Sequence, residues 1–158
     1  MAWSWFCVHH PGKYTCRGSL LASPARSFSR TSAVVETVAD KDYNFAGYDL
    51  YLESGRVQMR IGGTGGTQAA VAGKVPLNVW THVAGVYTGS QILIYVNGTQ
   101  VGQTPATGGL SNCSKDIYIG AWGIPGSGRY FQGQIDGIRL YNRALSPSEV
   151  RSLATSDQ

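Results

Sequence analysis

Apolar and polar side chains alternate along most of the chain after about residue 32, as they do in half-buried β-strands. Residues 48–53 and 56–61 both alternate, and the Ser54-Gly55 pair between them predicts an antiparallel hairpin with one buried and one solvent-facing side. In 92–104, Asn97-Gly98 interrupts an alternating run and tolerates the positive φ angles of a type I′ turn, which predicts a second hairpin. Further strand-like runs cover 33–38, 68–72, 79–87, 116–122 and 130–141. Short strands separated by regular turns predict an all-β sandwich.

One helix signal stands near the C-terminal end of this pattern. Ser146 suits the N-cap, Pro147 suits the first helical position, and Glu149 completes a Ser-x-x-Glu capping box. Val150 and Leu153 then share one face. The sequence therefore predicts a short helix that begins here and docks on the sandwich.

The composition agrees with a β-rich fold. The chain has 158 residues and 21 glycines, and only 14% of its residues are charged, against roughly 25% in an average globular protein. This length suits one domain with a sizeable core. No run approaches about 18 consecutive apolar residues, so we expect no membrane span.

The net charge of +4 originates in the N-terminal part of the chain. Residues 1–35 carry four basic residues and no acid, whereas nine basic and nine acidic residues cancel from Glu36 onward. Phosphate contacts need clustered Lys and Arg side chains. We therefore expect no nucleic-acid partner for the body of the protein.

The first 32 residues differ from the rest of the sequence. We expect an atypical N-terminal extension over 1–32 that packs on a domain spanning 33–158. The Arg- and Ser-rich part of this extension also resembles an organelle transit peptide, and nothing in it resembles a secretory signal. The cysteines Cys7, Cys16 and Cys113 form an odd count, which favours reduced thiols.

The motifs of residues 79–153 closely resemble those of bacterial laminin-G-like domains, which adopt the concanavalin A-like jelly roll. Such domains show W-x-H-V-A, then Y-V-x-G, then I-G, then F-x-G-x-I-D-x-V-R-[IL]-Y-N-R-A-L-[ST]-x-x-E-[IV]. The matching residues are Trp80, His82, Val83, Ala84, Tyr95, Val96, Gly98, Ile119, Gly120, Phe131, Gly133, Ile135, Asp136, Arg139, Tyr141, Asn142, Arg143, Ala144, Leu145, Ser146 and Glu149. The resemblance does not reach residues 1–32, where the family would supply an initial strand, so it indicates an atypical or truncated N-terminal part.

The resemblance implies a two-sheet antiparallel jelly-roll sandwich with one short C-terminal helix. It also implies an extracellular or cell-surface protein that binds carbohydrate or another ligand, and some of these domains hold a structural calcium. Localisation stays open, because the chain shows no recognisable export signal.

Asp136 is the candidate metal ligand. It lies in a strand-like run between apolar neighbours, and a buried carboxylate needs a cation or hydrogen-bond donors. Calcium accepts loop carbonyls as further ligands, so one acid can suffice. The alternative is a structural Asp that accepts loop N–H groups or pairs with Arg139 or Arg143. A melting temperature that does not respond to calcium or to a chelator would exclude the metal.

Two loops are candidate carbohydrate sites. In 121–131, Trp122 and Tyr130 could stack on the apolar face of a sugar, and Arg129 could donate hydrogen bonds to hydroxyls or a carboxylate. The rival loop at 41–45 offers Tyr43 and Phe45. For both loops, the alternative is that the aromatic rings cover the edge of the core.

We expect a binding module without catalytic activity. Retaining glycosidases need two carboxylates about 5–5.5 Å apart, and jelly-roll members carry them on an E-x-D-x-x-E or E-x-D-x-E strand that is absent here. His82 has no nucleophile or acid beside it in the sequence, so we expect a hydrogen-bonded core residue. The lead hypothesis is binding of carbohydrate or cell-surface glycan. The alternative is a structural domain that forms a homo-oligomer through an exposed sheet edge, and a glycan-active enzyme with unrecognised carboxylates is the third.

Overall fold

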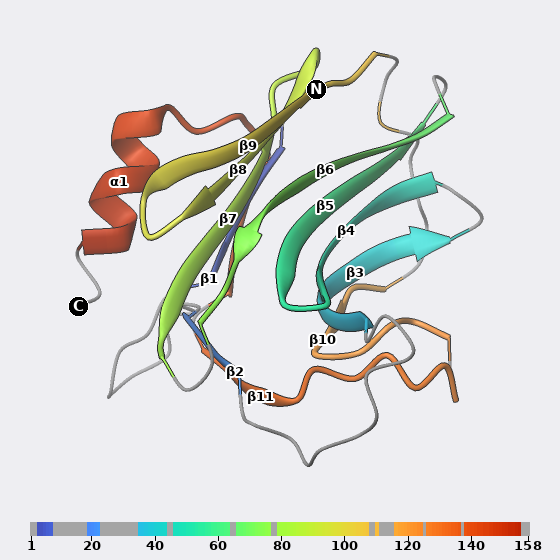
Figure 1. Ribbon diagram of the computed structural model, residues 1–158. Coiled ribbons are helices and arrows are strands. Elements are labelled where there is room, and N and C mark those ends of the chain that lie inside the picture. Colours follow the sequence, from blue (N-terminus) through green and yellow to red (C-terminus); the bar gives the residue numbers. More distant parts are fainter. Residues whose placement is uncertain are drawn as a thin grey trace.

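The computed structural model describes residues 3–7, 19–22, 35–43, 46–63, 66–76, 79–107, 110, 116–124, 126–136 and 138–155. Two antiparallel sheets face each other and a single short helix follows the last strand (Figure 1). The predicted all-β sandwich with one C-terminal helix is therefore confirmed. Among the described residues, no helix is long and apolar enough to cross a membrane.

The first sheet has five strands in the order β10-β3-β4-β5-β6. Their bounds are β3 Val35–Tyr43, β4 Ala46–Glu53, β5 Arg56–Gly63, β6 Gly66–Lys74 and β10 Tyr118–Ile119. The predicted β4–β5 hairpin is present, and its turn residues Ser54 and Gly55 have φ angles of 52° and 74°. Leu50, Leu52 and Met59 point into the core from this hairpin. Because successive side chains of a strand point to opposite faces, the polar residues that alternate with these three project from the other face of the sheet.

The second sheet is built around β7, all of whose residues are buried. Its strands are β1 Trp3–Cys7, β2 Ser19–Ala22, β7 Thr81–Tyr87, β8 Gln91–Val96, β9 Thr99–Pro105, β11 Gly133–Ile135 and β12 Ile138–Tyr141. β8 and β9 follow on one side of β7, joined through Asn97 and Gly98 with φ angles of 48° and 75°. These angles confirm the predicted type I′ turn.

The other side of β7 is occupied by the N-terminal strands. β1 pairs with residues 83–87 of β7, and β2 pairs with Thr81 and His82. β12 then pairs with β1, and β11 with β2. Two strands from before residue 32 thus lie inside the sheet. The predicted domain boundary at residue 32 stays a prediction. So does the predicted homo-oligomer that would form through an exposed sheet edge.

The main core lies between the two sheets, and one close contact in it involves a glycine. A Cβ atom placed at Gly85 of β7 would lie 2.5 Å from the sulfur and 3.3 Å from the Cβ of Met59 on β5. Gly85 therefore lets the Met59 side chain fill the space between the sheets. Real Cβ atoms essentially never lie within 3.0 Å of another heavy atom, so the 2.5 Å approach to the Met59 sulfur would force a shift.

We expect Gly85→Ala to lower the free energy of unfolding by about 2 kcal/mol, because the new methyl group overpacks the core against Met59. Urea denaturation measures the loss. Gly73→Ala is the matched control, since a Cβ there meets nothing within 4 Å, and it should change stability by less than about 0.5 kcal/mol. Adding Met59→Val to Gly85→Ala should recover part of the loss. Equal effects at Gly85 and Gly73 would contradict the packing argument.

The C-terminal helix, α1 (Pro147–Thr155), covers the outer face of the second sheet (Figure 1). Val150 and Leu145 form a second apolar cluster there with Ala84, Val86 and Tyr95. The predicted capping box is present: the Glu149 N–H donates to Ser146 Oγ (3.3 Å), and the Ser146 N–H donates to Glu149 Oε2 (2.8 Å).

We expect Ser146→Ala to destabilise the protein by about 1 kcal/mol, because the hydroxyl satisfies an N–H of the first helical turn. Thermal unfolding followed by circular dichroism measures this loss. Ser152→Ala, at an exposed position within the same helix, should be neutral or slightly stabilising. A Ser146→Ala protein as stable as the Ser152→Ala protein would show that the cap contributes nothing.

Candidate functional site

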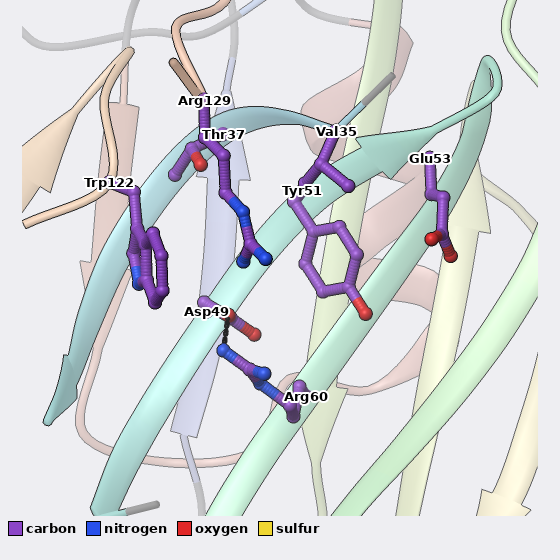
Figure 2. A pocket seen from close by; sticks show the side chains of 8 residues that line it. All are labelled: Val35, Thr37, Asp49, Tyr51, Glu53, Arg60, Trp122 and Arg129. Atoms are coloured by element: carbon purple, nitrogen blue, oxygen red, sulfur yellow. Dashed lines mark hydrogen bonds and ion pairs between the residues drawn. The ribbon is translucent and has the colours of Figure 1, made fainter. Parts of the chain in front are cut away.

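A hollow of about 210 Å3 lies on the outer face of the five-stranded sheet. A hairpin, described over residues 120–124 and 126–131, borders it. The lining residues are Val35, Thr37, Asp49, Tyr51, Glu53, Arg60, Trp122 and Arg129 (Figure 2).

The strand period explains why polar side chains gather there. On β4, Leu50 and Leu52 enter the core, so Asp49, Tyr51 and Glu53 project from the opposite face. The register of the sheet then places Thr37 of β3 opposite Tyr51. A register irregularity between residues 37 and 39 lies beside this pair, so the strand next to the hollow is locally bulged.

Asp40 of β3 holds the bordering hairpin in place. Its side chain is only 1% exposed, and Oδ2 accepts a hydrogen bond from the N–H of Gly123 at 2.9 Å. The N–H of Gly120 donates to the Val38 carbonyl at 3.0 Å, and the hairpin closes through a bridge between Ala121 and Tyr130. These contacts bring Trp122 and Arg129 over the sheet.

The carboxylates of the hollow are engaged by neighbouring side chains. Arg60 of β5 forms an ion pair with Asp49, which is 5% exposed. Gln58 bridges two residues that line the hollow. Its Nε2 donates to Glu53 Oε2 (2.5 Å), and its Oε1 accepts from the Tyr51 hydroxyl (2.9 Å). Burial, and then the negative charge of Asp49, raises the pKa of Tyr51, so the phenol stays protonated at neutral pH.

Arg129 is held in a different way. Its guanidinium stacks on the Trp122 ring, 4.0 Å from the ring centroid, and reaches over the sheet toward Tyr51 (Figure 2). Within the described part of the chain, the guanidinium nitrogens form no hydrogen bond or ion pair with protein atoms. The N–H donors of a guanidinium stacked on an aromatic ring point outward in the plane of the guanidinium, where a ligand can approach them edge-on.

The structure places the predicted ligand residues in different surroundings. Trp122 and Arg129 line the hollow, whereas Tyr130 is 49% exposed and does not line it. The side chain of Tyr43 and all of Phe45 lie outside the described residues. A ligand-binding role for any of them stays a prediction.

Sequence reasoning missed the residues that the sheet contributes. Val35, Thr37, Asp49, Tyr51, Glu53 and Arg60 all line the hollow. The alternation of 48–53 had already placed Asp49, Tyr51 and Glu53 on one wet face, which was the available signal. A wet face by itself does not indicate a site, because solvated sheet faces are common.

Asp136, the candidate calcium ligand, directly follows β11 and is half-buried. Among the described residues, no group of three or more His, Cys, Asp or Glu side chains gathers in a way that could hold a metal ion. Calcium takes six to eight oxygen ligands, many of which can be carbonyls. Calcium at Asp136 therefore stays a prediction.

Several solved structures share this fold. The binding domain of Paraclostridial Mosquitocidal Protein 1 superposes with a TM-score of 0.67 at 17% sequence identity, covering 98% of this chain and 37% of that one. The receptor binding domain of botulinum neurotoxin mosaic serotype C/D gives a TM-score of 0.68 at 12% identity, covering 98% of this chain and 36% of that one. The chain thus spans just over a third of these structures, and the likeness concerns the fold.

The sequence comparisons identify the family. No curated protein sequence matches the chain. The model of the family Laminin_G_3, described as the concanavalin A-like lectin/glucanases superfamily, matches residues 23–151. The match spans most of the chain: it begins after β1 and β2, covers the strands from β3 to β12, and ends within α1. The protein is therefore a member of this laminin-G-like family of concanavalin A-like jelly rolls.

Proposed function

We propose that this protein is a non-catalytic carbohydrate-binding module whose ligand lies in the hollow beside Trp122. The observation that carries the proposal is the convergence of two aromatic rings, two guanidiniums and two carboxylates at one depression of a rigid sheet. Sugars present an apolar face that stacks on aromatic rings and hydroxyl groups that bind charged side chains.

The size of the hollow suits a small part of a glycan. Its volume of about 210 Å3 is below the roughly 300–1,000 Å3 of sites for drug-sized ligands. One sugar residue is therefore a better match than a long oligosaccharide held along its length. Most of the hollow lies on β-strands, so the site is largely formed before the ligand arrives.

The arrangement of acids argues against glycoside hydrolysis. The two carboxylates of the hollow, Asp49 and Glu53, are four residues apart on one face of β4. The strand nevertheless departs from the E-x-D-x-E pattern, because Asp49 replaces its first Glu and Tyr51 replaces its central Asp. Both acids are also engaged, with Arg60 and Gln58 respectively.

Structurally similar proteins support the same class of ligand. One is botulinum neurotoxin type C, whose cell entry depends on interaction with two ganglioside molecules, at 15% identity over 36% of that chain. Another is the binding domain of botulinum neurotoxin DC in complex with SialylT, also at 15% identity. These proteins bind glycans, and the shared fold makes a glycan a reasonable first ligand to test here.

The proposal is tested with a glycan array followed by calorimetry on the best ligand. We expect Trp122→Ala to weaken binding at least about tenfold, since a buried aromatic anchor carries more than about 1 kcal/mol. Tyr130→Ala is the matched control, because Tyr130 belongs to the same hairpin but does not line the hollow. The Tyr130→Ala variant should bind the glycan as tightly as the wild type does. The proposal fails if no glycan binds or if both variants bind like the wild type.

A further inference from the structure

The charged groups of the hollow are unequally engaged by the protein. Asp49 and Arg60 neutralise each other, and Glu53 accepts a hydrogen bond from Gln58. Arg129 is held by Trp122 through ring stacking, which leaves its charge uncompensated by a carboxylate among the described residues. The hollow therefore offers one cation that a negatively charged ligand can pair with.

The surroundings of Arg129 suit a planar anion. Its contact with Trp122, 4.0 Å from the ring centroid, holds the guanidinium over the ring, and a guanidinium edge binds a carboxylate through two parallel N–H···O bonds. Thr37, only 3% exposed, also lines the hollow, and no hydrogen bond within the described residues engages its hydroxyl. The site thus holds a fixed cationic fork and a nearby neutral hydroxyl.

Tyr51 supplies the complementary apolar contact. Its ring lines the hollow, and its hydroxyl donates a hydrogen bond to Gln58. This hydrogen bond fixes the position of the ring. A pyranose ring could lie against this ring while a substituent on its C5 reaches Arg129. That substituent is a carboxylate in a uronate.

From this geometry we infer that the ligand is an acidic sugar, a uronate residue whose carboxylate pairs with Arg129. This inference rests on the proposed carbohydrate-binding function and adds the chemical class of the sugar. The bidentate match favours a carboxylate over a sulfate, because a carboxylate shares the planar geometry of the guanidinium.

The test compares oligogalacturonate, oligoglucuronate and oligomannuronate with their carboxyl-reduced counterparts by calorimetry. We expect at least one uronate to bind at least tenfold more tightly than its neutral counterpart. Arg129→Gln should remove this preference, so that the uronate and its neutral counterpart bind with equal affinity. Arg129→Lys should restore only part of it, because lysine keeps the charge but loses the fork.

Arg151→Gln is the matched control, since it removes the same charge from an exposed position on α1, outside the hollow. It should leave uronate binding unchanged. If neutral and acidic forms bind equally, or if a sulfated galactan binds while no uronate does, the inference is overturned and the carbohydrate-binding function stands. If none of these sugars binds, the inference is overturned, and the glycan array decides whether the proposed carbohydrate-binding function fails with it.

Discussion

Replacing Arg60 by Met should lower the free energy of unfolding by about 3 kcal/mol. Asp49 is 5% exposed and has Arg60 as its ion-pair partner. Removing one partner of a buried pair leaves a desolvated charge and costs about 3–5 kcal/mol. We expect the lower end of this range, because the Arg60 side chain retains 21% of its exposure and water can approach the pair. Urea denaturation at pH 7 measures the loss.

The double variant separates the cost of the orphaned carboxylate from the loss of the pair. Arg60→Met combined with Asp49→Leu should recover most of the stability, because no charge then remains buried. Arg56→Met is the matched control, since Arg56 is exposed on the same strand, and it should cost less than about 0.5 kcal/mol. If the double variant is as unstable as Arg60→Met, the ion pair does not determine this effect.

The protein should also lose on the order of 3 kcal/mol of stability between pH 7 and pH 4 because of His82. His82 is 5% exposed, and burial lowers its pKa from 6.5 to about 4, with the positive charge of Arg139 adding to the shift. Between these values the unfolded chain binds a proton at His82 that the folded protein does not bind. Stability is therefore fully present above pH 6.5 and falls as the pH drops toward 4, by about 1.4 kcal/mol for each pKa unit.

His82→Phe isolates this contribution, since phenylalanine does not titrate. The difference in unfolding free energy between wild type and variant should shift by about 3 kcal/mol between pH 7 and pH 4, whatever its value at pH 7. In the folded wild type, the proton resonance of the His82 ring should not titrate above about pH 5. A ring that titrates near pH 6.5 in the folded protein would refute the assignment.

The local features of this fold were predictable from short stretches of sequence. The turn at Asn97-Gly98 and the box of Ser146 and Glu149 depend on residues within three positions of one another, and both are present. The turn needs residues that tolerate positive φ angles, and the box needs side chains that accept hydrogen bonds from N–H groups at the start of the helix. In both cases the local residues themselves meet the need. The alternation of 48–53 likewise separated Leu50 from Asp49 correctly.

The hollow was only partly predictable, because it depends on contacts between distant segments. Trp122 and Arg129 were recognised from the residue types in their loop. Asp49 and Arg60 were assigned to a wet face, and only the docking of the hairpin against β3 turns that face into a depression. The N-terminal strands β1 and β2 were missed for a related reason, since each is at most five residues long and takes its place from pairing with β7.

The hydrogen bond from Gly123 to Asp40 spans 83 positions of sequence, and this separation has a consequence for biogenesis. The β3–β6 meander can pair as soon as residue 74 has emerged from the ribosome, because its contacts are between neighbouring strands. The wall carrying Trp122 can close only after some fifty further residues have emerged, so a ribosome-bound nascent chain would acquire the sheet well before it could retain a ligand.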